Sequence, residues 1–284
     1  EREFEEIKAS GSLQLPQEEL DRIRAYFAPP KFETLDDEMP VGSYDFENWK
    51  KTNIHKHRAP GYAIATISLK AIGQTPGDIS HVQMDALADL MDQFGIDEIR
   101  VSHEQNLVLP HAKKRDLPAI FARLQKLDLA TPNSGLITDI IACPGLDYCD
   151  LANARSIPIA KDIAKRFENL DRQHDIGELK IKISGCINAC GHHHAGHIGI
   201  LGVDKKGVEY YQILLGGSGA EDASVGNIMG PGFSAHDIGP AVERVVDTYV
   251  KLRQNGERFL DTYRRVGMEP FKNMAYLEQM YAAH

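Results

Sequence analysis

The four cysteines of this 284-residue sequence are the residues whose type and spacing most clearly indicate chemistry. Cys143 and Cys149 form a first pair with five residues between them, and Cys186 and Cys190 form a second pair with three. Thirty-six residues separate the pairs, and no cysteine occurs elsewhere in the sequence. Thiolates gathered in this way could hold a metal ion or an iron–sulfur cluster, and two pairs could also form disulfides.

Spacing and context rank four interpretations of these thiols. Disulfides would require an oxidising compartment, whereas the sequence is long and opens with charged residues rather than an apolar secretory segment. A zinc site prefers two to four residues between the ligands of each pair, so the first pair fits poorly. Free thiols are often buried as small hydrophobic groups, but burial alone does not explain the pairing. An iron–sulfur cluster needs four converging thiolates without one fixed spacing, so we favour it and keep the others open.

The surroundings of the cysteines suggest how they are positioned. Glycines flank both pairs and permit the unusual dihedral angles of a loop that wraps a compact cluster; they are Gly145, Gly185 and Gly191. Residues 180–184 alternate in polarity and predict a strand that ends just before Cys186. Sites on α/β sheets tend to lie at the carboxyl ends of strands, so we expect the second pair there.

A helix is expected to follow the first pair. Apolar residues recur at helical spacing after Cys149 and continue to Phe167, and Pro158 is expected to bend the helix. A helix amino end near Cys149 would offset the negative charge of a cluster held by four thiolates. The sequence therefore predicts that the first pair lies against a helix terminus.

The two cysteine motifs resemble the signature of the nitrite and sulfite reductases that couple a [4Fe-4S] cluster to sirohaem. The first motif reads Ala-Cys-Pro-Gly-Leu-Asp-Tyr-Cys-Asp-Leu-Ala from position 142, and the second reads Ser-Gly-Cys-Ile-Asn-Ala-Cys-Gly from position 184. The resemblance continues over residues 100–107 and 214–217. It implies that all four cysteines are ligands of the cluster and that Cys190 also bridges to the sirohaem iron.

The same resemblance implies that three amide side chains bind the cofactor. Gln105 and Asn106 fall in a hairpin region where the family places polar contacts to the cofactor, although amides there also cap turns. Asn188 lies inside the second cysteine motif and is assigned to the cofactor together with Cys190.

The resemblance covers only one of the two copies that members of this family contain. Each copy has a ferredoxin-like half-domain followed by a larger α/β lobe, and this sequence resembles the carboxy-terminal half, as in the haemoprotein beta-component of sulfite reductase. The arginines and lysines that hold the substrate anion belong chiefly to the amino-terminal copy. That half, or an equivalent chain, is therefore an expected partner, and we expect the carboxy-terminal half alone to be inactive.

The reaction implied by the resemblance is the six-electron reduction of sulfite to sulfide, with electrons from a flavoprotein or a ferredoxin. Reduction of nitrite to ammonium by the same cofactors is the alternative, and no single residue decides between the two anions. A cluster-bearing electron-transfer module without haem and a zinc-stabilised interaction domain also remain open.

A run of histidines follows the last cysteine: His192, His193 and His194, with His197 shortly after. Consecutive residues cannot all point at one ion, so the run is a poor metal site. If Cys190 bridges two metal centres, one of these histidines could donate protons to a bound oxyanion. The alternative is a polar role at the surface or against the cofactor.

The predicted fold is of the α+β class, with a ferredoxin-like half-domain followed by an α/β lobe. Residues 1–56 are expected to form an extension and linker, residues 57–132 the half-domain, and residues 133–284 the lobe that binds the [4Fe-4S] cluster and sirohaem. Between residues 61 and 130 the sequence predicts a strand, a helix closed by Gly95, two strands and a second helix. This β-α-β-β-α order is most of a ferredoxin-like sandwich.

The only tryptophan, Trp49, lies beside Lys50 and Lys51 in the predicted extension. Two interpretations are open: this corner could face an acidic cofactor, or it could be a surface anchor with solvated lysines. The lysines alone do not decide between them.

Composition excludes several classes of function. The content of 42% hydrophobic and 26% charged residues is that of an ordinary globular protein, which we expect in the cytoplasm. No apolar run approaches the length needed to span a membrane. The net charge of -9 argues against general nucleic-acid binding, because phosphate contacts need a basic surface.

Overall fold

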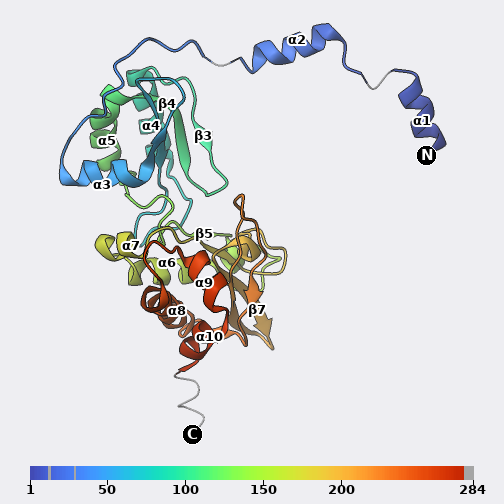
Figure 1. The fold of residues 1–284 in the computed structure, drawn as a ribbon, viewed down its shortest axis with the longest axis vertical. Helices are drawn as coiled ribbons and strands as arrows, with labels where there is room; N and C mark the ends of the chain where they lie inside the picture. Colours follow the sequence, from blue (N-terminus) through green and yellow to red (C-terminus); the bar gives the residue numbers. More distant parts are fainter. Residues whose placement is uncertain (12–13, 29, 278–284) are drawn as a thin grey trace. The chain divides into compact units, whose positions relative to one another are not determined.

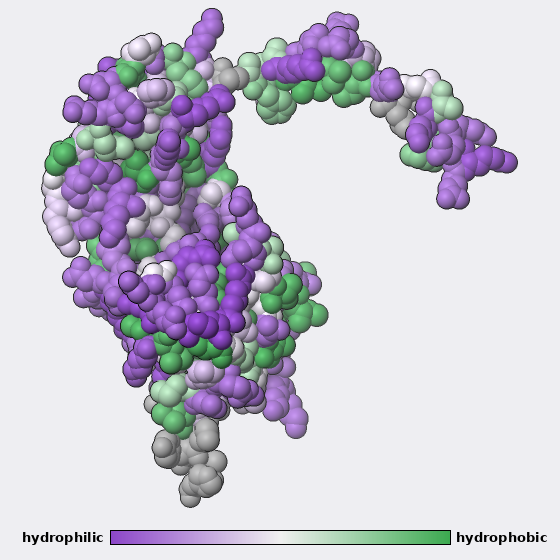
Figure 2. Space-filling model, viewed as in Figure 1, coloured by the Kyte–Doolittle hydropathy of each residue, from purple (hydrophilic) through white to green (hydrophobic). Residues whose placement is uncertain are grey.

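The structure, a computed structural model, describes residues 1–11, 14–28 and 30–277. The chain forms two units, Glu1–Asp36 and Asp37–His284, and the second contains nearly all of the internal packing (Figure 1). No helix within the described residues is both long enough and apolar enough to cross a membrane. The view in Figure 2 shows a largely hydrophilic surface with apolar patches between the polar side chains.

The first unit consists of two short helices, α1 (Arg2–Ala9) and α2 (Gln17–Tyr26). Neither helix buries a residue, and the Tyr26 side chain is 81% exposed. A helix of this length in water depends on packing for its stability. This unit therefore adds nothing to the core that positions the cysteines.

The second unit begins with a ferredoxin-like half-domain, as predicted. Its elements are α3 (Tyr44–Asn53), β1 (Ile54–Lys56), β2 (Tyr62–Ile67), α4 (His81–Phe94), β3 (Arg100–Val101), β4 (Leu107–Lys113) and α5 (Leu117–Gln125). The sheet order is β1-β2-β4-β3, and β4 is antiparallel to both of its neighbours. Strand β4 therefore lies between the two strands joined by α4, which is the split β-α-β arrangement.

Helix α4 shows how local sequence sets an element's bounds. The Ser80 side chain accepts the Gln83 backbone N–H, and the Gln83 side chain accepts the Ser80 N–H, so a capping box starts the helix. Gly95 ends it in the left-handed conformation with φ of 62°. The predicted end of this helix at Gly95 is confirmed.

Trp49 lies in the core of the half-domain, and both roles predicted for it were wrong. Its side chain is fully buried and packs against Phe46 and Phe121, with ring centroids 6.1 and 5.4 Å away. Helix α3 buries Phe46 and Trp49, while Lys51 is exposed and Lys50 is half-buried over the Phe46 ring. Compact structure thus begins at Asp37, within the extension predicted over residues 1–56.

The second part of this unit is the α/β lobe. Its strands are β5 (Ile141–Ala142), β6 (Ile181–Ser184), β7 (Ile198–Lys205), β8 (Val208–Leu215), β9 (Asn227–Ile228) and β10 (Phe233–Ser234). Its helices are α6 (Ile157–Arg166), α7 (Leu170–Ile176), α8 (Ile238–Leu252), α9 (Phe259–Val266) and α10 (Glu269–Ala275). The sheet order is β10-β8-β7-β6-β5, in which β5, β6 and β7 are parallel. The predicted α+β class is confirmed.

Pro158 begins a helix where the sequence predicted a bend. Helix α6 starts at Ile157, and Pro158 occupies its first turn, where a missing N–H is tolerated. Cys149 and the residues up to Ser156 are turns rather than helix. The helix thus begins eight residues after Cys149, yet its N-cap residue Ser156 places its Oγ 3.3 Å from Cys143 Sγ, so a helix amino end does lie against the first cysteine pair.

A buried polar network joins the half-domain to the lobe. The Lys70 ammonium contacts an Asp139 carboxylate oxygen at 3.1 Å, and their side chains are 1% and 4% exposed. The Asn106 amide also donates to Asp139, at 2.9 Å, and the Gly135 backbone N–H donates to its other oxygen at 2.9 Å. One carboxylate oxygen thus accepts from the half-domain and the other from the lobe, which fixes the two parts of this unit on each other.

Candidate functional site

The two cysteine pairs begin at the carboxyl ends of neighbouring parallel strands. Cys143 directly follows β5, and Cys186 lies two residues after β6. The Cys143 backbone N–H donates to the Ile183 carbonyl at 3.1 Å, which continues the pairing of the two strands. Strand pairing thus brings together two cysteines that are far apart in the sequence, at the edge where α/β sheets place their sites.

The four thiols range from buried to exposed. Cys143 and Cys186 are 7% and 8% exposed, Cys149 is half-buried and Cys190 is exposed. All four are free thiols. Cys190 is therefore the most exposed of the four cysteines.

The sulfur of Cys143 sits in a polar environment that suits a thiolate. The Gly185 backbone N–H donates to Cys143 Sγ at 3.0 Å, and Ser156 Oγ lies 3.3 Å from the same sulfur. Hydrogen bonds to a sulfur stabilise its anionic form, which is the form that binds a metal. The second cysteine loop thereby supports a ligand in the first.

The flanking glycines serve two purposes, of which the sequence predicted one. Gly145 has a φ of 61°, which confirms the unusual dihedral expected there. Gly185 and Gly191 are needed for close approach instead: a Cβ on Gly185 would meet the Ala154 carbonyl at 2.5 Å, and one on Gly191 would overlap the Ile183 carbonyl. Backbone from both loops packs where these side chains are absent.

Three residues other than glycine adopt the left-handed conformation around the cysteines. They are Gln105, Ala189 and His192, with φ of 58°, 57° and 52°. Such residues cost on the order of 1–3 kcal/mol each and gather at sites where the strain has a use. Ala189 and His192 lie on either side of Cys190 and set its orientation.

The donor set fits a cluster better than a single ion. Among the described residues, no three or more Cys, His, Asp or Glu side chains are arranged to hold one metal ion. A four-iron cluster gives each thiolate its own iron, so its ligands need not meet at one point. Two buried thiols, one half-buried thiol and one exposed thiol on adjoining loops are compatible with that arrangement.

The structure separates the histidines of the run. His193 is buried, its Nδ1 has no hydrogen-bond partner in the described part of the chain, and burial lowers the pKa of its ring. His197 is also buried, where desolvation lowers its pKa to about 4, and its Nδ1 accepts the Lys180 N–H. Both rings are neutral at pH 7. His192 and His194 face a cavity, so the predicted proton-donor role is left to these two and stays a prediction.

The amides predicted to bind the cofactor already have protein partners. The Gln105 side chain donates to the Ala142 carbonyl at 2.8 Å and accepts the Ala142 N–H at 3.1 Å. Asn106 is fully buried: its side-chain oxygen accepts the Leu69 N–H, and its side-chain nitrogen donates to Asp139. Gln105 nevertheless lines a cavity of about 290 Å³ beside Cys143. Asn188 is exposed, and cofactor contact by these three residues stays a prediction.

Replacing Gln105 by alanine is expected to loosen the attachment of the hairpin to β5. Two backbone groups of Ala142 would lose their partners, at a net cost of about 1–3 kcal/mol. Urea denaturation of the variant should show this decrease in the free energy of unfolding. An exposed amide such as Gln14 offers the control, since Gln14→Ala should change stability by less than about 0.5 kcal/mol.

A polar cavity of about 440 Å³ adjoins the second cysteine loop, and we call it the lysine pocket. Its lining residues include Lys180 and Lys182 of the β6 region, His192, His194 and Arg258. The two lysines were not among the residues predicted for the site. Their alternate spacing on a strand that leads into a cysteine pair places both side chains on one face, and this signal could have found them.

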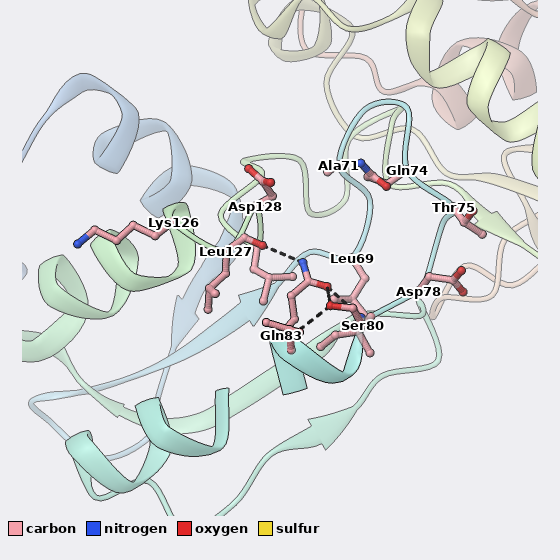
Figure 3. Close-up of a pocket in the computed structure, with 13 residues that line it drawn as sticks. Leu69, Ala71, Gln74, Thr75, Asp78, Ser80, Gln83, Lys126, Leu127 and Asp128 are labelled. Atoms are coloured by element: carbon pink, nitrogen blue, oxygen red, sulfur yellow. Dashed lines mark hydrogen bonds between the residues drawn. The ribbon is translucent and has the colours of Figure 1, made fainter. Parts of the chain in front are cut away.

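Another cavity, of about 570 Å³, belongs to the half-domain (Figure 3). It lies between the loop before α4 and the end of α5, where the Gln83 amide donates to the Leu127 carbonyl. Of the described residues, no cysteine lines it. Its size therefore does not make it the candidate site.

Comparison with known families agrees with the two-part architecture. The family described as "Nitrite and sulphite reductase 4Fe-4S domain" matches residues 135–282, about half of the chain. The chain belongs to this family. The "Nitrite/Sulfite reductase ferredoxin-like half domain" matches residues 55–127. Membership of this oxidoreductase family gives the chain its cofactors, a [4Fe-4S] cluster and sirohaem.

Curated members of the family with similar sequences include reductases of both anions. "Sulfite reductase [ferredoxin] 2" of Mycolicibacterium paratuberculosis is 32% identical over 67% of this chain and 36% of its own length. The chloroplastic "Ferredoxin--nitrite reductase" of Zea mays is 30% identical over 58% of this chain and 30% of its own length. The chain thus spans about a third of the length of these relatives.

Solved structures confirm the reductase fold. The NirA protein of Mycobacterium tuberculosis superposes with a TM-score of 0.67 at 24% identity, over 90% of this chain and 46% of that protein. A dissimilatory sulfite reductase, DsrI, superposes with a TM-score of 0.62 at 14% identity, over 75% of this chain and 69% of that one. At these identities the likeness concerns the fold.

Proposed function

We propose that this chain is the cofactor-holding half of a sulfite reductase, with Cys143, Cys149, Cys186 and Cys190 as the ligands of its [4Fe-4S] cluster. Cys190 is assigned a second bond, to the iron of sirohaem. The observation that carries this proposal is the order of exposure. The two cysteines that follow β5 and β6 are buried, whereas Cys190 is exposed. A ligand shared between two groups must reach both of them.

The protein's own groups hold and orient these ligands. When bound, the cluster and sirohaem supply the electrons and the metal at which an oxyanion is reduced. The Gly185 N–H donates a hydrogen bond to Cys143 Sγ, and Ala189 and His192 on either side of Cys190 have left-handed backbone. Gln105 ties the hairpin to the strand that carries Cys143. These contacts preorganise the site, so little protein motion is needed when the cofactors bind.

The proposed substrate is sulfite, reduced by six electrons to sulfide, and nitrite is the second candidate. Sulfite reductases that are 32% identical are among the relatives of this chain, whereas the nitrite reductases of Zea mays, Synechococcus elongatus and Betula pendula are 30%, 28% and 26% identical. Several of these relatives carry ferredoxin in their names, so we propose a ferredoxin as donor, with a flavoprotein as the alternative. We place the reaction in the cytoplasm, where thiols stay reduced until they bind iron.

Reconstitution of the chain under anaerobic conditions tests this proposal. We expect about four cluster irons and one sirohaem iron per chain, acid-labile sulfide and haem-like absorption bands. Stoichiometric zinc without iron would contradict the proposal. Iron and sulfide without sirohaem would indicate that the chain is an electron-transfer module instead of part of a reductase. Sulfite and nitrite reduction with a reduced dye should be near zero for the isolated chain and appear when the missing amino-terminal half is added.

A further inference from the structure

Residues 153–156, which we call the junction segment, connect the two cysteine loops through their backbone. The Ala154 N–H donates to the Gly185 carbonyl of the second loop at 3.0 Å, and the Ala154 carbonyl accepts the Leu146 N–H of the first loop at 3.2 Å. Ala154 is fully buried between them. The position of the junction segment therefore decides how the two cysteine loops meet.

The middle of the junction segment is held by Glu209, near the start of β8. Oε2 of Glu209 accepts the Arg155 backbone N–H at 2.8 Å, and Oε1 accepts from the Arg155 guanidinium. Tyr211 lies on the same face of β8, and its hydroxyl is 2.9 Å from both Glu209 Oε2 and the Arg155 carbonyl oxygen. Two side chains of one strand thus contact both backbone polar groups of a single loop residue.

Glu209 is ionised although its side chain is only 22% exposed. Burial opposes ionisation, but the hydrogen bonds from the Arg155 N–H and the Tyr211 hydroxyl, together with the guanidinium charge, outweigh burial and lower the pKa of Glu209. The same guanidinium lies 3.4 Å from Asp147, between the cysteines of the first pair. The Arg155 side chain is 52% exposed, so these ion pairs contribute little by themselves. The contact of the carboxylate with the Arg155 backbone is therefore the one that holds the segment.

Close packing on the β7 side leaves the junction segment no room to shift. A Cβ on Gly202 of β7 would come within 2.6 Å of the Ala154 Cβ and 3.2 Å of the Gly185 Cα. Gly202 pairs with Tyr211 across the two strands. The β7–β8 hairpin thus packs against the segment with one strand and binds its backbone with the other.

We propose that Glu209 is a positioning residue for the [4Fe-4S] cluster, which fixes the junction segment and thereby the ligands Cys143 and Cys149. This inference rests on the proposed function, because that function assigns both cysteines to the cluster. The Cys149 N–H donates to the Gly145 carbonyl at 2.9 Å, so one end of this cysteine's loop is fixed by its own backbone and the other by the junction segment. Groups that orient metal ligands typically change metal affinity about 10–100-fold.

Alkylation of Cys149 in the cofactor-free chain tests the inference, with Glu257 as the matched control. Glu257 is 18% exposed and also accepts a backbone N–H, a hydroxyl and an arginine side chain, but in the loop between α8 and α9. Glu209→Ala should raise the rate at which iodoacetamide labels Cys149 at least about tenfold, because the open form of the loop becomes more populated. Peptide mass spectrometry measures this rate. Glu257→Ala should leave it within about twofold of the wild-type rate.

Two further variants separate the backbone contact from the ion pair. Arg155→Ala keeps the N–H that donates to Glu209, so the labelling of Cys149 should rise less than about threefold. A rise equal to that of Glu209→Ala would contradict the role of the backbone contact. If Glu209→Ala does not fold, Glu209→Gln replaces it: one oxygen acceptor remains, so labelling should rise about threefold, while Glu257→Gln leaves it unchanged.

Retention of the cluster provides the second measurement. In the reconstituted chain, Glu209→Ala should lose acid-labile sulfide to a chelator at least about tenfold faster than the wild type, and Glu257→Ala should lose it at the wild-type rate. The inference is overturned if either measurement shows no difference between these two variants. The proposed function would survive that result as long as the wild-type chain binds the cluster. Stoichiometric zinc, with Cys149 labelling that still depends on Glu209, would instead refute the proposed function and leave Glu209 as a residue that positions Cys149.

Discussion

Cys190→Ala is expected to remove sirohaem from the reconstituted chain. The loss of cluster sulfide should be much smaller than the loss of sirohaem. Loss of groups that merely orient a metal ligand weakens metal binding about 10–100-fold, so loss of the ligand itself should weaken sirohaem retention by at least that factor. Cys143 and Cys186 stay in their buried positions and still hold iron. The absorption bands of sirohaem relative to protein, with iron and acid-labile sulfide assays, measure the effect.

Ile187→Ala is the matched control for this variant. Ile187 lies in the same loop, is 78% exposed and carries no ligand atom, so its truncation should leave both cofactors in place. Full sirohaem retention by Cys190→Ala would show that another residue binds the sirohaem iron. Equal loss of sirohaem and cluster from both variants would point to a disrupted loop rather than to a lost ligand.

Asp139→Ala is expected to be the most destabilising substitution outside the cysteine loops. It would leave the Lys70 ammonium buried with the Glu104 carbonyl, at 2.6 Å, as its remaining partner. Removal of one member of a buried ion pair typically costs about 3–5 kcal/mol. The Asn106 amide and the Gly135 N–H would also lose their acceptor. Urea or thermal unfolding of the cofactor-free chain measures the loss.

Two comparisons separate the buried charge from a general effect of losing a carboxylate. Asp175 forms an ion pair with Arg253 at 2.7 Å, but its side chain is 60% exposed, so Asp175→Ala should cost less than about 1 kcal/mol. The double variant Lys70→Met, Asp139→Leu should recover most of the stability lost in Asp139→Ala, because no unpaired charge remains. An Asp139→Ala protein as stable as the Asp175→Ala protein would contradict this account.

The fold could be predicted wherever one local signal decides an element. Gly95 ended its helix because a left-handed residue there suits glycine, and residues 180–184 formed a strand because their polarity alternates. Trp49 was misassigned because its role depends on a contact distant in the sequence, and Pro158 because apolar spacing alone does not show that the helix begins at Ile157. Trp49 is buried by Phe121, seventy-two positions away, and neighbouring lysines do not reveal such a partner.

The candidate site was predictable in its ligands but not in its surroundings. The spacing of the cysteines and the resemblance together led to the family. The hydrogen bond from Gly185 to Cys143 and the pairing of Gln105 with Ala142 arise only when β5 meets β6 and the hairpin. Lys180 and Lys182 escaped notice because a lysine on a strand is usually solvated, and only the structure shows that both line one cavity with His192 and His194.

The pairing of β5 with β6 also orders the maturation of the protein. Before these strands meet, the chain carries two separate cysteine pairs, and neither pair alone supplies the four thiolates of a cluster. Parallel strands joined by a long connection pair slowly, because the entropy cost of closing the loop precedes the stabilising contacts between the strands. With the four cysteines proposed as ligands, the complete set of thiolates exists only once β5 and β6 have paired.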